Sequence, residues 1–464
     1  MSGATLFEKI WQSHVVRSFG ERSLIHIDRH LAHEGTSRNA FDGLRNRQRG
    51  IRNLELTFGV IDHDPSTLPG RNATTYEPSR ERIGAMQENC REFGLRLFDV
   101  NDPGQGIVHV IATEHGIVLP GMTVVCGDSH TATSGGVGAW GWGIGTTEVE
   151  RVFATQTLLL AQPKTMRANF AGRVSDGVTP KDLILYLIGR HGVAIGTGYA
   201  VEYAGPAIRA LSVEGRLTIC NMSIEFGARS GMIAPDDVTI QFFEGRPYAP
   251  TGALWDRAVA SWRSLSTADA AVFDREIDID CSGVSPQVTW GTSPQEVIGI
   301  DERIPAPSEV IPERRAAAVQ ALGYMGLEPG TRMEGLPIDY AFIGSCTNSR
   351  LSDLKAAAAV IKGRKVPQTV TALVVPGSSQ VKAAAEAIGL DRIFKDAGFQ
   401  WRESGCSMCQ TLGGDFVPPG RRCISTSNRN FEDRQGSKSR THLASPAMVA
   451  AAAVHGRIVD VRRI

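Results

Sequence analysis

The chain has 464 residues, of which 42% are hydrophobic and 21% are charged, and this composition is that of an ordinary globular protein. Lys plus Arg and Asp plus Glu number 49 each, so no net charge favours nucleic acid or an anionic membrane as a partner. At roughly 150 residues per domain the length predicts about three domains. Eight cysteines are too sparse for a disulfide scaffold, which favours a reducing cytoplasm.

The first predicted element is an amphipathic helix that starts within residues 5–16, TLFEKIWQSHVV. The segment has no continuous apolar run of the kind that a signal peptide carries. No later stretch is long and apolar enough to read as a membrane span. The sequence therefore predicts a protein without a membrane partner.

An alternation of strands and helices follows along the chain. Val- and Ile-rich runs at 122–128, 338–344 and 370–377 predict strands that are buried on both faces. Alanine-rich stretches at 354–363 and 381–389 predict the helices between them. Residues 178–192 predict a further helix, with Thr179 as its cap and Pro180 at its first position. The pattern indicates an α/β protein.

Polar shifts in composition suggest two domain boundaries, near residues 172 and 292. We therefore expect three α/β domains, at 1–172, 173–292 and 293–464. The glycine-rich segment 134–150 lacks both a dinucleotide fingerprint and a phosphate-binding lysine motif. Its glycines are expected to let the backbone approach a ligand or cluster.

Histidines and carboxylates gather in what we expect to be short turns. These are Asp62 and His63, then His109, then Asp128 and His130. A single such residue is more often structural than functional. Acid–histidine pairs that end apolar segments are more informative, because strand ends in α/β sheets open onto the ligand crevice. They are candidates for proton transfer.

Three cysteines carry the clearest chemical signal: Cys346 in GSCTNS, and Cys406 and Cys409 in GCSMC. Each lies just beyond a segment that is typical of a strand-to-helix junction. Three thiolates with a fourth position left open suit an iron–sulfur cluster that acts as a Lewis acid. A CxxC pair also serves zinc ribbons and thiol redox sites, so the residues alone leave the choice open. Arg429 and Arg434 can bind carboxylates bidentately, whereas an unplaced arginine more often forms a surface ion pair.

The chain as a whole resembles the large-subunit family of the 3-isopropylmalate dehydratases, in the aconitase superfamily of hydro-lyases. The most specific motifs are GDSHT, GSCTNS, GCSMC and SNRNF, and their order matches the family. Further matches run from TLFEKIWQSHVV through IDRHLAHE, TFGVIDHD, GIVHV and TICNMSIEFGA to THLASPAM. The resemblance covers essentially the entire chain.

The resemblance implies three aconitase-type α/β domains around a central cleft, without the mobile fourth domain. It implies one 4Fe-4S cluster on Cys346, Cys406 and Cys409. Residues implied as catalytic are Asp62, His63, His109, Asp128, His130 and Glu225, and those implied to bind substrate are Asn221, Asn428, Arg429 and Arg434. A separate small subunit would supply the fourth domain and a catalytic serine, so this chain by itself should be half of a cytoplasmic heterodimer.

The implied reaction is the isomerisation of 2-isopropylmalate and 3-isopropylmalate by dehydration and rehydration, in leucine biosynthesis. The chain departs from the common family pattern at Arg38, Asp64, Trp140, Trp142 and Asp433. These departures leave open a paralogous hydratase of maleate, citraconate, a methyl-substituted malate or homoaconitate. Two alternatives come from other classes: a nucleic-acid-binding regulator, which zero net charge disfavours, and a zinc-stabilised structural subunit.

Overall fold

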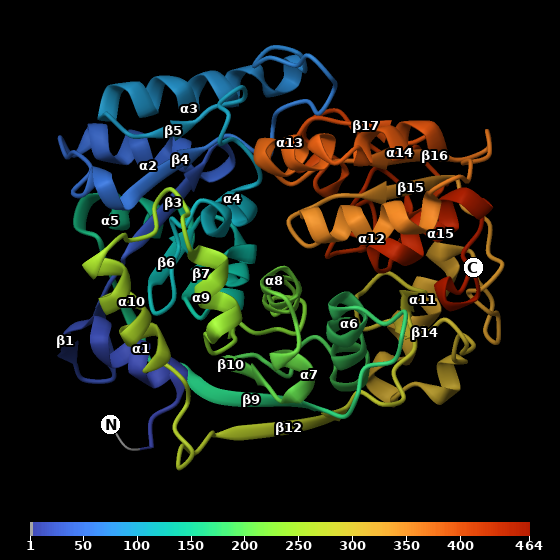
Figure 1. The fold of residues 1–464 in the computed structure, drawn as a ribbon, viewed down its shortest axis with the longest axis horizontal. Helices are drawn as coiled ribbons and strands as arrows, with labels where there is room; N and C mark the ends of the chain where they lie inside the picture. The colour runs from blue at the N-terminus through green and yellow to red at the C-terminus, as the bar shows by residue number, and fades with distance from the viewer. Residues whose placement is uncertain (1–2) are drawn as a thin grey trace. The chain divides into compact units, whose positions relative to one another are not determined.

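The computed structural model describes residues 3–464, which divide into two compact units. Unit 1 contains residues 3–64, 77–172 and 194–280, and unit 2 contains residues 65–76, 173–193 and 281–464. Both units are mixed α/β with parallel sheets (Figure 1), which confirms the predicted fold class. The finer division into three domains stays a prediction.

Unit 1 is built on a five-stranded parallel sheet with the order β5-β4-β3-β6-β7. The first of these strands in the chain is therefore central, and the chain moves outward first on one side and then on the other. β3 and β6 flank the point where the direction reverses, which is where α/β sheets bind ligands. The strands are β3 (Arg29–His33), β4 (Thr57–Val60), β5 (Leu97–Phe98), β6 (Thr123–Cys126) and β7 (Trp140–Gly143).

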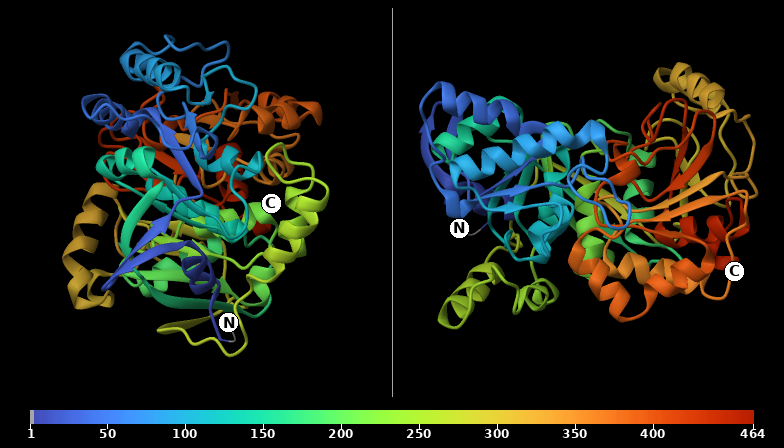
Figure 2. Two further views of the ribbon diagram at one scale, coloured as in Figure 1. Left: turned by 90° about the vertical axis from the view of Figure 1, so that its left-hand side faces the viewer. Right: turned by 90° about the horizontal axis from the view of Figure 1, so that it is seen from above.

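Helices connect and flank this sheet. Apolar residues from the strands and from the loop around residues 117–119 form its core with helical side chains, among them Val108 and Leu217. The helices are α1 (Leu6–His14), α2 (Glu34–Asn46), α3 (Arg80–Phe93), α4 (Val108–Glu114), α5 (Thr146–Thr155), α7 (Pro206–Arg209), α8 (Val213–Asn221), α9 (Asp237–Phe243) and α10 (Ala253–Arg263). α9 and α10, yellow-green in Figure 2, pack on this unit through Phe243 and Trp262, whose ring centroids lie 5.9 Å apart.

Two smaller sheets complete unit 1. A parallel sheet has the order β11-β10-β9-β12, and its strands are β9 (Lys164–Ala171), β10 (Tyr199–Ala204), β11 (Ser230–Met232) and β12 (Arg275–Asp280). An antiparallel sheet has the order β1-β2-β8, with β1 (Val15–Phe19), β2 (Arg22–His26) and β8 (Thr157–Ala161).

Unit 2 repeats the topology of the main sheet of unit 1. Its five parallel strands have the order β17-β16-β15-β18-β19, so that β15 and β18 flank the reversal point. The strands are β15 (Tyr340–Ile343), β16 (Thr371–Val374), β17 (Gln400–Trp401), β18 (Arg422–Ser425) and β19 (Arg440–Leu443). A separate antiparallel pair, β13 (Gln287–Thr289) and β14 (Val297–Gly299), precedes them in the chain. The helices are α6 (Pro180–His191), α11 (Arg315–Met325), α12 (Leu351–Ile361), α13 (Ser379–Ala387), α14 (Leu390–Ala397) and α15 (Pro446–His455).

Local sequence signals account for the ends of several predicted elements. α1 begins after Thr5, whose side chain and Glu8 form a reciprocal capping box. α6 begins in the same way after Thr179, with Pro180 at its first position and Asp182 closing the box. These helices, the strands β6, β15 and β16, and the alanine-rich α12 and α13 confirm the predicted elements. Within the described chain no helix is long and apolar enough to cross a membrane.

Candidate active site

The sheet of unit 1 places its acid–histidine pairs at the carboxyl ends of neighbouring strands. His33 is the last residue of β3, Asp62 and His63 follow β4, and Asp128 follows β6. Because parallel strands end at the same edge, residues that are distant in sequence meet there. His109 lies in the first turn of α4 instead of the short turn that the sequence predicted, because residues 108–114 form a helix. It still reaches the group from there.

These side chains are linked in a continuous chain of hydrogen bonds and ion pairs, which we call the histidine–carboxylate group (Asp62, His63, His109, Asp128, His130 and Glu225). Asp128 is its centre: its Oδ1 lies 2.7 Å from Nε2 of His109, and its Oδ2 lies 3.5 Å from Nε2 of His63. Asp62 extends the chain at one end, 2.5 Å from Nδ1 of His63. At the other end Nε2 of His130 lies 3.1 Å from Glu225. The arrangement suits proton transfer.

Burial and the attraction of opposite charges shift the pKa values of Asp128 and His130. Burial alone would raise the pKa of Asp128, but His109, together with hydrogen bonds from His130 and His63, outweighs it and holds that pKa well below its usual range. Burial would lower the pKa of His130, but Glu225 and Asp128 raise it to about 9. At neutral pH His130 is therefore an imidazolium between two carboxylates.

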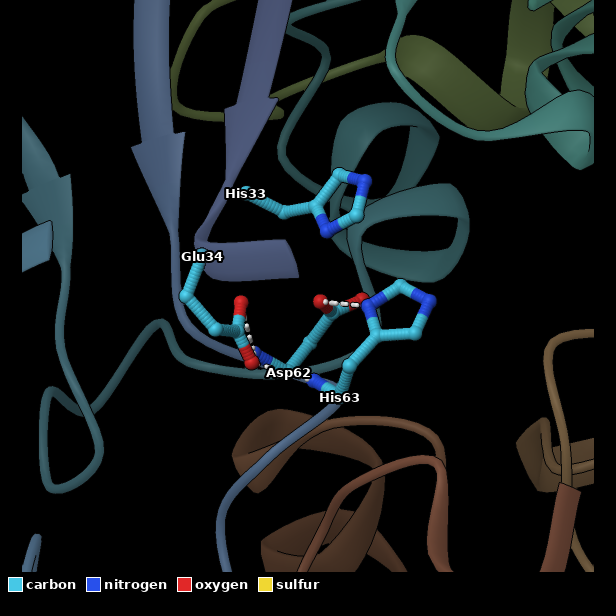
Figure 3. Close-up of side chains that lie close together, drawn as sticks. All are labelled: His33, Glu34, Asp62 and His63. Carbon is cyan, nitrogen blue, oxygen red and sulfur yellow. Dashed lines mark hydrogen bonds and ion pairs between the residues drawn. The ribbon is translucent and has the colours of Figure 1, made fainter. Parts of the chain in front are cut away.

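His33 and Glu34 adjoin Asp62 and His63, as Figure 3 shows. The four side chains are of types that can bind a metal ion, and their ligand atoms all lie within 4.8 Å of one another. No other group of three or more such side chains in residues 3–464 is this close. The carboxylate of Glu34, however, accepts hydrogen bonds from the backbone N–H groups of His63 at 2.7 Å and Asp64 at 2.8 Å. It also accepts one from the N–H of Asp62 at 3.2 Å.

The remaining oxygens of this set are engaged as well. Asp62 accepts from His63 through Oδ1 and from the backbone of Val108 through Oδ2, at 2.8 Å. Burial, and then the proximity of His63, lowers the pKa of His33 to about 4, so its ring is neutral at pH 7. The ring stacks on that of His63, with the two ring centroids 4.5 Å apart. The set is therefore a hydrogen-bonded anchor for the Asp62–Asp64 turn and not a ready metal site.

Asn221 and Glu225 lie at and just beyond the end of α8. Asn221 is fully buried and donates to the hydroxyl of Thr133 at 2.9 Å. Thr133 in turn donates to the carbonyl of His130 at 2.6 Å. Asn221 thus supports the segment that carries His130.

In unit 2 the cysteines and the SNRNF motif lie at the corresponding place in the second sheet. Cys346 follows β15, and Asn428 follows β18, the strand beside it. The amide of Asn428 donates to Sγ of Cys346 at 3.4 Å. The reversal point of the sheet therefore brings GSCTNS and SNRNF together.

Cys409 joins the same cluster of side chains. Ser345 donates to Sγ of Cys409 at 3.3 Å and lies 4.0 Å from Sγ of Cys346. Cys406 and Cys409 share one tight turn, closed by a hydrogen bond of 3.0 Å from the N–H of Cys409 to the carbonyl of Cys406. The strand-to-helix junction predicted around this pair is wrong, since the loop leads through a short 3-10 turn at Ser407–Cys409 to strand β18.

The donor set fits a thiolate-held iron–sulfur cluster. All three cysteines are buried and not in disulfides, and hydroxyl, amide and guanidinium donors approach the sulfurs of Cys346 and Cys409. In a single tetrahedral zinc site the sulfurs would lie within about 4 Å of one another. Among the described residues, the sulfurs of Cys346, Cys406 and Cys409 do not all lie within 4.8 Å of one another. They are therefore spaced more widely than the ligands of one zinc ion.

Both predicted substrate arginines lie in the loop between β18 and β19, and Arg434 reaches this cluster of side chains. Arg434 places Nη2 3.7 Å from Sγ of Cys409, and its buried Nε has no hydrogen-bond partner among residues 3–464. A buried donor without a partner is costly, so this Nε is suited to an anionic ligand. Arg429 is half-buried one residue after Asn428.

A buried lysine that the sequence analysis missed supports this loop. Lys181, in the first turn of α6, is fully buried and donates through Nζ to the carbonyls of Thr426 at 3.1 Å and Ser427 at 2.6 Å. Glu34 was missed in the same way. Glu34 ends IDRHLAHE and Lys181 follows Pro180 in the first turn of α6, and only the partners that they reach in space reveal their roles.

The departures from the family pattern make contacts within their own units. Arg38 pairs with Glu81 at the surface, and Asp64 pairs with Arg82. Trp140 stacks on Trp142 with ring centroids 4.0 Å apart. Asp433 accepts from the backbone N–H of Lys438 in an exposed turn.

The glycine-rich segment packs against its own unit. A Cβ on Gly135 would collide with the carbonyl of Gly231, and one on Gly136 would collide with the backbone of Leu217. The predicted close approach of backbone to a ligand is therefore wrong for these two glycines, which instead let β11 and α8 pack closely.

Comparisons with known proteins identify the family of this chain. The family model described as the aconitase family (aconitate hydratase) matches residues 8–456. The 3-isopropylmalate dehydratase large subunit 1 of Bradyrhizobium diazoefficiens is 56% identical over 463 residues, which cover 99% of this chain and 97% of that protein. The crystal structure of aconitase X from Thermococcus kodakaraensis, in its holo form, aligns with a TM-score of 0.47 and 12% identity over 92% of this chain and 88% of that one.

Aconitase family members generally depend on an iron–sulfur group. Cys346, Cys406 and Cys409 are among the chain's buried free cysteines, and hydrogen-bond donors approach the sulfurs of Cys346 and Cys409. The family model spans nearly all of its residues. This chain therefore belongs to the aconitase family.

Proposed function

We propose that this chain is the large subunit of an iron–sulfur hydro-lyase that interconverts 2-isopropylmalate and 3-isopropylmalate by dehydration and rehydration, in leucine biosynthesis. The observation that carries the proposal is the 56% identity to a 3-isopropylmalate dehydratase large subunit over 99% of the chain. The cysteines, Asn428 and the arginines at the reversal point of the second sheet supply the matching chemistry.

Cys346, Cys406 and Cys409 would hold one 4Fe-4S cluster, which when bound supplies a Lewis acid for the departing hydroxyl group of the substrate. Arg434 and Arg429 bind carboxylate, for which the guanidinium fork is well shaped. Asn428 orients the sulfur of Cys346 and, in this proposal, also contacts substrate. Asn221 keeps its predicted substrate role, in addition to its support of the His130 segment.

The histidine–carboxylate group moves protons. His130 holds a proton between Asp128 and Glu225, and we assign it the role of acid toward the leaving hydroxyl. Loss of hydroxide with that proton releases water, while the proton of the adjacent carbon goes to a base. His63 and His109 share Asp128 with His130. When water adds to the other carbon, its oxygen bonds to that carbon and one of its protons returns to His130, while the protonated base gives its proton to the neighbouring carbon.

The partner is assigned to a small subunit, since the name of the relative from Bradyrhizobium diazoefficiens describes a large subunit. The base is assigned to a serine on that subunit, as the resemblance of the sequence to the family implies. The heterodimer would act in the cytoplasm. No contact of the five departures from the family pattern favours a different diacid.

The test is to co-purify the chain anaerobically with the small subunit encoded beside it and to assay a panel of diacids. The panel contains 2-isopropylmalate, 3-isopropylmalate, maleate, citraconate, methyl-substituted malates and homoaconitate. The highest kcat/KM is expected for the isopropylmalates, and only with both subunits present. A higher value for another diacid would reassign the substrate, and full turnover by this chain alone would refute the two-subunit arrangement.

A further inference from the structure

The turn that carries Cys406 and Cys409 contains a residue in an unusual backbone conformation. Ser407 has a φ of 51°, which lies in the left-handed region that residues other than glycine adopt at a cost. Such conformations persist where the surrounding structure determines them. The neighbours of Ser407 should therefore include a group that holds it.

Asp415 is that group. Ser407 is fully buried and donates through its hydroxyl to Oδ2 of Asp415 at 2.8 Å. The hydroxyl of Thr67, also fully buried, donates to the same oxygen. Nη2 of Arg402 lies 3.4 Å from Oδ1. One carboxylate thus joins the cysteine turn to a separate segment of unit 2.

That segment, residues 65–76, is attached to the cysteine loop on both sides of the turn. Before the turn, the carbonyl of Thr67 accepts from the N–H of Glu403 at 2.8 Å, and Arg71 donates to the carbonyl of Ser404. After the turn, Gly413 approaches the carbonyl of Pro65 so closely that a Cβ would collide with it. The cysteine turn is therefore held against a backbone that is itself anchored.

We propose that Asp415 is a positioning residue, which fixes the Cys406–Cys409 turn so that both thiolates keep the geometry that the cluster needs. The inference rests on the proposed function, since it presumes that the turn binds a cluster. Without Asp415 the three cysteines remain, so a cluster still forms. It is lost faster, because Ser407 can relax out of its left-handed conformation and turn one thiolate away.

The experiment measures cluster retention separately from catalysis. Wild type, Asp415→Asn and Asp415→Ala are reconstituted anaerobically, iron and sulfide per chain are determined, and the decay of the visible absorption is followed after addition of an iron chelator. We expect near-normal loading and at least about tenfold faster decay in Asp415→Ala, which corresponds to about 1.4 kcal/mol. Asp415→Asn should decay at an intermediate rate, because its amide oxygen still accepts hydrogen bonds.

Two further variants distinguish positioning from general stability. Ser407→Gly in the Asp415→Ala background should restore retention, since glycine adopts positive φ without a partner. Asp301→Asn is the matched control: Asp301 also accepts from a serine hydroxyl in unit 2, that of Ser285 at 2.8 Å. It should leave the decay rate unchanged. If Asp415→Ala does not fold, Thr67→Val takes its place in the experiment. This substitution removes one of the two hydroxyl groups that donate to Asp415 and keeps a similar volume, so cluster decay should be faster than in wild type but slower than expected for Asp415→Ala.

The outcomes separate the two levels of the proposal. A wild-type protein that binds no cluster overturns the proposed function. A wild type that binds a cluster, with equal decay in the Asp415 or Thr67 variants, overturns the positioning role. A lower thermal stability of the metal-free Asp415 variants with unchanged decay also overturns it and assigns Asp415 to folding alone.

Discussion

The side-chain amide of Asn428 donates to the sulfur of Cys346 at 3.4 Å, although the two residues are 82 positions apart. They meet because β15 and β18 are neighbours at the reversal point of the sheet, and each residue follows the end of its strand. The same topology in unit 1 brings His33 and Asp128 to the ends of β3 and β6. Two sheets with the same strand order thus present thiols in one unit and a histidine and a carboxylate in the other, each at the reversal point.

Replacement of Cys406 by serine should abolish the cluster, because a hydroxyl is a poor ligand for iron in such clusters. Iron and sulfide analysis after anaerobic reconstitution, with the visible absorption band, measures this. Cys423→Ala is the matched control: Cys423 is buried in β18, and burial raises the pKa of its thiol, which keeps it neutral. Full iron and sulfide content in Cys406→Ser would show that the cluster is held elsewhere.

Replacement of Arg434 or Arg429 by lysine should lower kcat/KM at least about tenfold with the small subunit present, since lysine keeps the charge but loses the fork. Cluster content and melting temperature should stay near wild type. Arg421→Lys is the matched control, because Arg421 forms an exposed ion pair with Asp339 in the same unit. Wild-type efficiency in both variants would mean that the carboxylate is bound by other residues.

Glu34→Ala should lower the free energy of unfolding by at least about 2 kcal/mol, since it leaves backbone N–H groups of the Asp62–Asp64 turn buried and without an acceptor. Urea unfolding measures the change. Glu81→Ala, which removes only a surface ion pair with Arg38, should cost less than about 1 kcal/mol. Equal losses in the two variants would contradict the anchoring role of Glu34.

The imidazolium of His130 should make stability and activity fall at alkaline pH. Its pKa is raised to about 9 in the folded chain from 6.5, so folding favours the protonated form. The resulting stabilisation is fully present below about pH 6.5 and is lost as the pH rises through about 9. His130→Gln should therefore be most destabilising at pH 6 and progressively less so toward pH 10. Urea unfolding at a series of pH values measures this, and a constant difference would mean that His130 is neutral.

Much of the secondary structure could be predicted from the sequence, and the sequence also indicated the candidate site residues. Thr179 and Pro180 mark the start of α6 through local capping, and the valine- and isoleucine-rich runs mark buried strands because their residues face helices on both sides. The residue types in GDSHT, GSCTNS and GCSMC indicated proton carriers and thiolate ligands. These signals are local, so they can be read without knowledge of the fold.

Tertiary structure alone decided which residues support the chemistry. Glu34 accepts a hydrogen bond from a residue 28 positions away, and Lys181 donates to one 245 positions away. Asp415 accepts from Thr67 across 348 positions. Such partnerships depend on strand order and on the burial that makes an unsatisfied polar group costly. The sequence by itself determined the candidate reactive residues and many of the elements that carry them, whereas strand order decided which of them meet and what holds them in place.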